Sequence, residues 1–172
     1  SIYRAMESIH AEEVVLRRVL AVESYHLEAK LNLAMLLSRD RDEPGEAIRL
    51  LEEAVEQDPT CSKATAELAW LLIQEKQDFA RAERLLSQSL HGDEDYVWSR
   101  LYVGSYLWCY KGQDVEQVFR EQIAAHPTHA AGYWSLANYL IDEKGQWEDA
   151  LKYLQEAVRG DDINPVAHWF LG

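Results

Sequence analysis

The stretch WSLANYLIDEKGQWEDALKYLQEA at residues 134–157 contains two features that recur along this chain. The first is Leu136-Ala137, a large apolar residue followed by a small one, and the second is Leu154, which precedes another small residue, Gly172, by 18 positions. The first feature recurs at Leu33-Ala34, Leu68-Ala69, Val103-Gly104 and Leu171-Gly172. The second recurs at Leu16, Leu51, Leu86 and Phe119, each of which lies 18 residues before the small residue of one of these pairs. A constant offset with a period of about 33 to 35 residues is typical of arrays in which each repeat buries its apolar side against its neighbours. The spacing therefore predicts a repeated pair of helices.

The residues around the recurring positions show where each helix of the pair lies. Leu36 and Leu37 follow Leu33 by three and four residues, which is the helical period. After turns that contain Pro44-Gly45, Gln77-Asp78, Gly112-Gln113 or Gly145-Gln146, the second helices are expected to open with Ala47, Ala82, Val115 and Ala150. Pro59 and Pro127 are expected to end two second helices, because proline has no backbone N–H to donate.

These residues resemble the tetratricopeptide repeat family. The matching positions are Ala47, Leu51, Ala54 and Asp58-Pro59 in one copy, and Trp134, Leu136-Ala137, Gly145, Ala150, Leu154 and Ala157 in another. The resemblance covers nearly the whole chain, and it implies an all-α, right-handed superhelical solenoid of antiparallel helix pairs. One repeat departs from the pattern: it is two residues shorter between Gly104 and Phe119, and Gln122 replaces a small residue. Its packing is therefore expected to differ.

The repeats divide the chain into about four complete helix pairs with a partial repeat at each end. We expect a single solenoid over residues 1–172, with helix pairs at 27–59, 62–92, 95–127 and 130–162. Residues 1–23 match the second helix of a preceding repeat, and residues 165–172 match the start of a further first helix. The sequence therefore predicts a segment of a longer array.

Composition and the absence of catalytic motifs favour surface recognition over chemistry. The net charge of −13 would repel phosphate backbones, so no nucleic-acid partner is expected. No run approaches the roughly 18 apolar residues of a membrane span, so no membrane insertion is expected. Two solitary cysteines, Cys61 and Cys109, suit a reducing, cytoplasmic compartment. His126 and His129 have no further ligand nearby for a metal, and no catalytic or cofactor-binding motif is recognised, which predicts a non-enzyme without cofactor or metal.

Tryptophans gather on one face of the predicted first helices. We take as the reference residue of each repeat the large residue of the recurring pair, namely Leu33, Leu68, Val103, Leu136 or Leu171. The face consists of the positions two and five residues before and after this reference residue, because the helical period places them on the opposite side of the helix. The predicted partner-binding groove contains Leu31, Met35, Trp70, Ile73, Trp98, Leu101, Trp108, Trp134, Asn138, Ile141 and Trp169. In the resembled family the first helices line the concave surface, which implies that this face is a groove. The alternative is that some of these rings pack in the core between adjacent first helices.

The apolar groove with an acidic rim predicts a scaffold or adaptor that binds an apolar or amphipathic peptide segment with hydrophobic anchors and some basic residues. Some members of the resembled family bind acidic chaperone tails through lysines, but Leu31, Ala66 and Leu101 stand at those places here, which argues against that ligand. The alternatives are a regulatory or assembly arm of a larger enzyme or complex, or a secretion-type chaperone. The open ends of the array also predict self-association.

Overall fold

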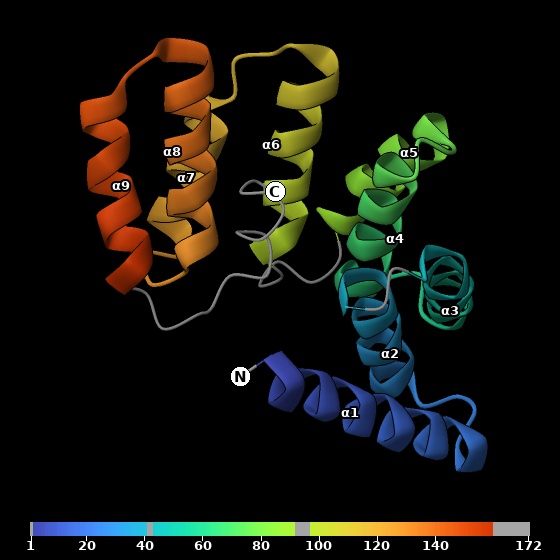
Figure 1. The fold of residues 1–172 in the computed structure, drawn as a ribbon. Coiled ribbons are helices and arrows are strands. Elements are labelled where there is room, and N and C mark those ends of the chain that lie inside the picture. The colour runs from blue at the N-terminus through green and yellow to red at the C-terminus, as the bar shows by residue number, and fades with distance from the viewer. Residues whose placement is uncertain (1, 41–42, 92–96, 160–172) are drawn as a thin grey trace. The chain divides into compact units, whose positions relative to one another are not determined.

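The computed structural model describes residues 2–40, 43–91 and 97–159, and this part of the chain contains helices and no strands (Figure 1). The helices are α1 (Ile2–Val22), α2 (Leu27–Asp40), α3 (Pro44–Gln57), α4 (Ser62–Gln74), α5 (Phe79–Ser89), α6 (Val97–Lys111), α7 (Glu116–Ala125), α8 (Ala130–Lys144) and α9 (Trp147–Arg159). They form two compact units, which we call unit 1 (residues 1–96) and unit 2 (residues 97–172). The predicted all-α fold of helix pairs is confirmed.

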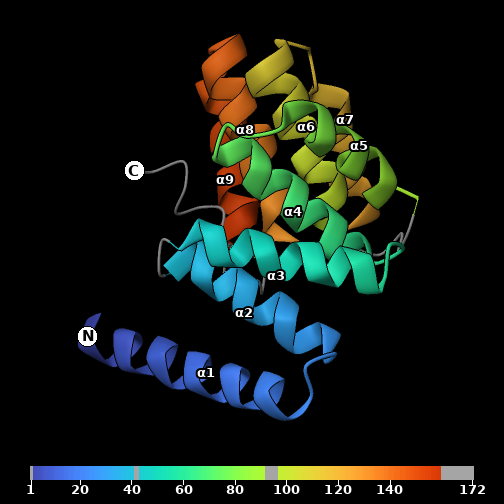
Figure 2. The same ribbon diagram turned by 90° about the vertical axis from the view of Figure 1, so that its right-hand side faces the viewer.

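Unit 1 contains the helix pairs α2–α3 and α4–α5, and α1 packs against α2 (Figures 1 and 2). In α3 the buried residues Ala47, Leu50, Leu51 and Ala54 recur at intervals of three and four, so they form one stripe along the helix. Helix α5 begins where the carboxylate of Asp78 accepts a 2.8 Å hydrogen bond from the backbone N–H of Arg81. This cap satisfies one of the N–H groups that the first turn of a helix leaves without a partner.

The recurring pair of a large and a small residue lies at the centre of unit 1. Leu33, Ala34, Leu68 and Ala69 are all fully buried. A small side chain at this position lets two helix backbones approach closely, and the leucine beside it fills the space between them. The sequence pattern therefore marks the helix-packing face, as predicted.

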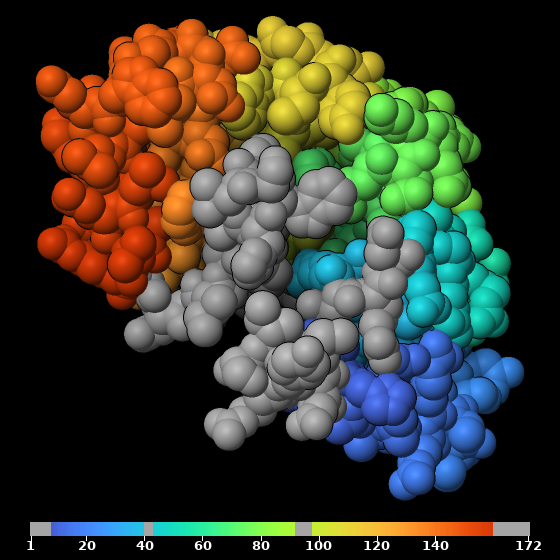
Figure 3. Space-filling view, in the orientation of Figure 1, coloured from blue at the N-terminus to red at the C-terminus, as the bar shows by residue number. Residues whose placement is uncertain are grey.

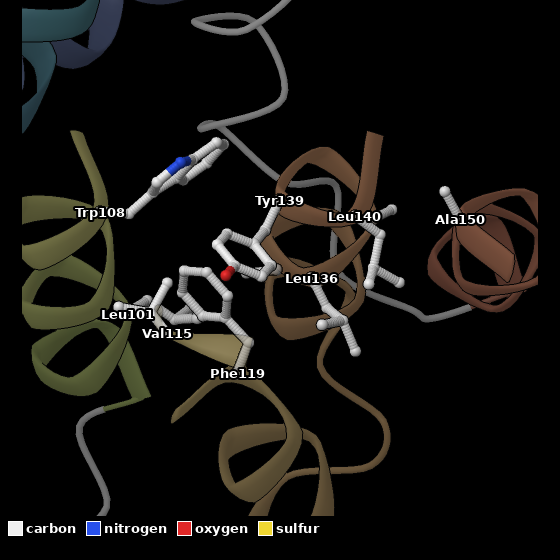
Figure 4. Packing of buried hydrophobic residues seen from close by; sticks show 10 residues of the cluster. Leu101, Trp108, Val115, Phe119, Leu136, Tyr139, Leu140 and Ala150 are labelled. Atoms are coloured by element: carbon white, nitrogen blue, oxygen red, sulfur yellow. The ribbon is translucent and has the colours of Figure 1, made fainter. Parts of the chain in front are cut away.

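Unit 2 contains the pairs α6–α7 and α8–α9 around one hydrophobic cluster, which includes Trp108, Phe119, Tyr139 and Ala150 (Figure 4). The shortened repeat packs tightly here. A Cβ atom added to Gly104 would lie 2.6 Å from the ring of Phe119, so only glycine fits on α6 at this point. Gln122, which replaces the usual small residue, is fully buried in the same repeat.

Three second helices begin earlier than the sequence predicted. Helix α3 begins at Pro44 and not at Ala47, because the fixed φ and missing N–H of proline suit the first position of a helix. Helix α5 begins directly after its cap at Asp78. Helix α8 ends at Lys144, directly before Gly145, whose φ of 64° is accessible to glycine at little cost, and α9 begins two residues later at Trp147. Trp147, which precedes the predicted start at Ala150, therefore lies in the first turn of α9.

The proposed ends of the second helices before Pro59 and Pro127 agree with the structure, since α3 ends at Gln57 and α7 at Ala125. The predicted further first helix at residues 165–172, with Trp169, lies outside the described residues.

Candidate partner-binding surfaces

Six residues of the predicted groove are partly exposed, and they occur in both units. Met35 and Trp70 lie in unit 1, and Trp98, Trp134, Asn138 and Ile141 lie in unit 2. We call the first set the α2–α4 surface and the second set the α6–α8 surface. Both surfaces are formed by first helices of their pairs, as the sequence predicted, and each is described here within its own unit.

Four other residues of the predicted groove are buried: Leu31, Ile73, Leu101 and Trp108. In unit 2, Leu101 and Trp108 belong to the hydrophobic cluster that α6 and α8 share. A partner cannot reach these side chains without rearranging the core. These four side chains are buried because adjacent first helices pack against each other. Core packing of this kind is the alternative to a groove that the sequence also allowed.

Trp108 holds α6 against α8 through two contacts. Its ring meets the ring of Tyr139 edge-on, with 5.5 Å between the ring centroids (Figure 4). Its indole Nε1–H donates a 2.8 Å hydrogen bond to Oε1 of Glu143. A buried tryptophan needs such an acceptor, because an indole N–H without a partner would be costly in the core. The two residues are 35 positions apart, and no local sequence motif indicates this hydrogen bond.

The α6–α8 surface has a stripe of partly exposed side chains on α8. Trp134, Asn138 and Ile141 are spaced by four and three residues, so they lie in line on one face of the helix, and each is partly exposed. Trp98 from α6 is held in place by two rings: it stacks on Tyr102 at 6.0 Å and meets His129 edge-on at 5.5 Å. The surface therefore offers aromatic and aliphatic side chains whose positions the fold has already fixed.

The α2–α4 surface combines apolar and polar groups. Met35 and Trp70 occupy equivalent positions, 35 residues apart, on α2 and α4. Nearby, the ammonium of Lys63 on α4 lies 2.8 Å from Oε1 of Glu28 and 3.3 Å from Oδ1 of Asn32, both on α2. The only basic residue of the predicted face is thus paired with groups of its own unit.

The thiol of Cys109, near the C-terminal end of α6, lies close to two carboxylates of α8. Burial raises the pKa of the Cys109 thiol above its ordinary value, and the carboxylates of Asp142 and Glu143 raise this pKa further. A thiol with a raised pKa remains protonated at neutral pH and is a poor nucleophile. The position of Cys109 therefore supports no nucleophilic chemistry.

An ion pair connects the turn between α6 and α7 to α8. The ammonium of Lys144 lies 2.7 Å from Oδ2 of Asp114. This hydrogen bond, followed by bonds from the Glu116 backbone N–H and the Tyr139 hydroxyl, lowers the pKa of Asp114 to about 2. Asp114 is therefore fully charged at neutral pH and holds the turn against α8.

His126 and His129 lie in the turn between α7 and α8, where the backbone N–H of His129 donates to the carbonyl of His126 at 3.1 Å. Among the described side chains, no three from His, Cys, Asp and Glu are close enough together to hold a metal ion. A search of the same residues for a helix with the length and apolar character to cross a membrane found none.

Comparison with known proteins assigns the fold. The model of the tetratricopeptide repeat family matches residues 38–99. The solved structure of MamA has a TM-score of 0.59 and 21% identity, covering 92% of this chain and 91% of MamA. PilF of Pseudomonas aeruginosa has a TM-score of 0.67 and 18% identity, covering 94% of this chain and 73% of that protein.

A third similar structure is YrrB, described as a TPR protein with an unusual peptide-binding site. It has a TM-score of 0.55 and 16% identity, covering 99% of this chain and 88% of YrrB. At such identities these structures show a shared fold and not a shared ligand. No curated protein matches the sequence.

Proposed function

Since this chain carries tetratricopeptide repeats, we propose that it is a non-catalytic scaffold that binds protein or peptide partners. Its main binding site is the α6–α8 surface of unit 2. The observation that carries this proposal is the stripe of Trp134, Asn138 and Ile141, which remains partly exposed although its helix also carries the buried residues Leu136, Ala137, Tyr139 and Leu140.

The stripe has the composition of a peptide-binding surface. Trp is enriched among residues that dominate binding energies, and truncation of such an anchor typically costs about 2 kcal/mol or more. Asn138, between the two apolar residues, has an amide that both donates and accepts hydrogen bonds, and it can thus fix the register of a bound backbone. The ligand class is therefore a segment with at least two apolar side chains spaced to contact Trp134 and Ile141.

Charge defines the rest of the partner. The exposed carboxylates of Asp142 and Glu143 follow the stripe directly on α8, and the whole chain carries a net charge of −13. Complementary charge increases the association rate and excludes like-charged competitors. We therefore expect basic residues beside the apolar anchors of the partner, and we expect nucleic acids not to bind.

The α2–α4 surface of unit 1 is a second, smaller candidate. Met35 is unbranched and adapts to irregular shapes, and Trp70 provides an aromatic face at the equivalent position of the next repeat. Because Lys63 is already paired with Glu28 and Asn32, this surface offers no free cation for an acidic ligand. It also suits apolar side chains.

A displayed library of random 16-residue peptides, selected on the purified chain, tests the proposal. Selected peptides should carry aromatic or aliphatic anchors together with Lys or Arg. Trp134→Ala should weaken their binding by about 30-fold, which corresponds to about 2 kcal/mol, and Trp70→Ala shows whether the second surface takes part.

The matched control is Tyr110→Ala, which removes an exposed aromatic side chain of α6 outside the predicted groove. Circular dichroism shows whether each variant retains its helices. The proposal fails if folded Trp134→Ala binds the selected peptides as tightly as the unmodified chain, or if Tyr110→Ala weakens binding equally.

A further inference from the structure

A row of apolar side chains runs along α9 without a covering helix in the described part of the chain. Trp147, Leu151 and Val158 are 66%, 56% and 77% exposed, and Leu154 between them is partly buried. Their spacing of four, three and four residues places them on one face of the helix. We call this set the α9 row. Figure 3 shows α9 in red at the outer edge of unit 2.

The other side of α9 is already occupied. Ala150 and Ala157 are buried, and α9 packs closely on α8. Leu154 packs partly against the hydrophobic cluster of unit 2. The exposed side chains of Trp147, Leu151 and Val158 therefore form an additional apolar surface beside that contact. Large apolar side chains exposed in a continuous row indicate a binding site for another protein segment.

Helix α7 of the same unit shows what covers the equivalent surface. Phe119 and Ile123 of α7 occupy the repeat positions of Leu154 and Val158, 35 residues earlier. The following first helix, α8, covers both of them. The ring of Phe119 meets that of Tyr139 with 6.3 Å between centroids, and Cγ1 of Ile123 lies 3.1 Å from the Cβ position of Gly132.

The absence of a side chain at Gly132 lets α8 approach Ile123 this closely. The same repeat position, four residues before each reference residue, is small throughout: Ala29, Ala64, Ser99, Gly132 and Ala167. Ala167 follows Gly132 by 35 residues, just as Val158 follows Ile123. The chain thus contains, after α9, a segment with the residue that this contact requires.

We propose that the α9 row binds residues 165–172 of the same chain as the first helix of a further repeat, with Ala167 against Val158. Residues 160–164 connect Arg159 to Pro165, and four residues, 126–129, make the equivalent connection from α7 to α8. The connection is therefore long enough. The inference does not depend on the proposed peptide-binding function.

A second copy of the chain fits the α9 row less well. The helix that covers α7 is a first helix of a pair, and a copy approaching with its N-terminal end would present α1. Because α1 is followed by the first helix α2, it occupies the place of a second helix. It would therefore bring the wrong kind of helix to the surface.

Disulfide trapping tests this placement. In a chain with Cys61→Ser and Cys109→Ser, the pair Val158→Cys and Ala167→Cys should form an intramolecular disulfide on mild oxidation, since bonded cysteines need Cβ atoms about 4 Å apart. The control pair, Glu156→Cys and Ala167→Cys, places the first cysteine two residues away on an exposed position that points in nearly the opposite direction.

Non-reducing electrophoresis and mass spectrometry separate the outcomes. A monomeric disulfide that forms at least about tenfold faster in the Val158 pair than in the Glu156 pair supports the proposal. Disulfide-linked dimers would show that a second copy covers the α9 row, and equal rates or no disulfide would show that residues 165–172 do not bind there. Each of these latter results overturns the proposal.

Discussion

The indole N–H of Trp108 and the carboxylate of Glu143 form a 2.8 Å hydrogen bond that joins two first helices of neighbouring repeats. Trp108 is 8% exposed, so the bond is shielded from water on one side, while Glu143 lies at the surface. A tryptophan expected in the groove is therefore a structural residue that fixes the spacing of α6 and α8.

Trp108→Phe should destabilise unit 2 by about 1 to 2 kcal/mol, because the ring contact with Tyr139 is largely kept and the bond to the carboxylate is lost. Urea denaturation followed by circular dichroism measures the change. Glu143→Gln retains an acceptor oxygen and should cost less. A Trp108→Phe variant as stable as the unmodified chain would show that the hydrogen bond does not contribute.

Gly104→Ala should also destabilise unit 2, by about 1 to 3 kcal/mol, because the new methyl group would lie 2.6 Å from the Phe119 ring. Gly45→Ala is the matched control, since nothing lies within 4 Å of its Cβ position, and this change should be neutral or slightly stabilising. Thermal denaturation of both variants tests the difference. Equal melting temperatures would contradict the close contact between Gly104 and Phe119.

Glu53→Ala should destabilise unit 1 by about 1 to 3 kcal/mol. The side chain of Lys30 is almost completely buried and its ammonium lies 3.1 Å from Oε2 of Glu53, so removal of the carboxylate leaves a largely buried charge without its counter-ion. Adding Lys30→Met should recover most of the loss, because it removes the charge and keeps the apolar stem. If the double variant is no more stable than Glu53→Ala, the buried charge is not the cause.

The pKa of Asp114 should be close to 2 when measured by NMR titration of its carboxyl carbon. Since this pKa is lowered on folding, ionised Asp114 stabilises the fold fully above the unfolded value of about 3.9, and the contribution is lost as pH falls through about 2. Lys144→Gln should move the titration midpoint upward toward the ordinary range. An unchanged midpoint would show that Lys144 is not the main cause of the shift.

The helix pairs could be predicted from the sequence because the recurring residues that define them are buried in both units. Leu33, Leu68 and Leu136, each followed by alanine, are fully buried, and such positions tolerate little else. The starts of second helices were misplaced at Pro44 and Trp147, because local capping at Gly145 and the preference of proline for the first turn determine them.

Exposure of the tryptophan face could not be predicted from the repeat pattern. Trp108 and Ile141 occupy the same repeat position, five residues after the reference residue, but Trp108 is buried and Ile141 is partly exposed. Trp108 is covered by Tyr139 and Glu143 of the next first helix. Exposure therefore depends on the neighbouring repeat and not only on the residue's own position, which no single copy of the motif reveals.

Within each unit, every described packing contact joins helices that are adjacent in the chain or separated by one helix. Such contacts close only short loops, so little chain entropy is lost before native interactions form. Each unit should therefore fold rapidly from any of its helix pairs. Gain or loss of a whole pair during evolution would then leave the remaining pairs able to fold.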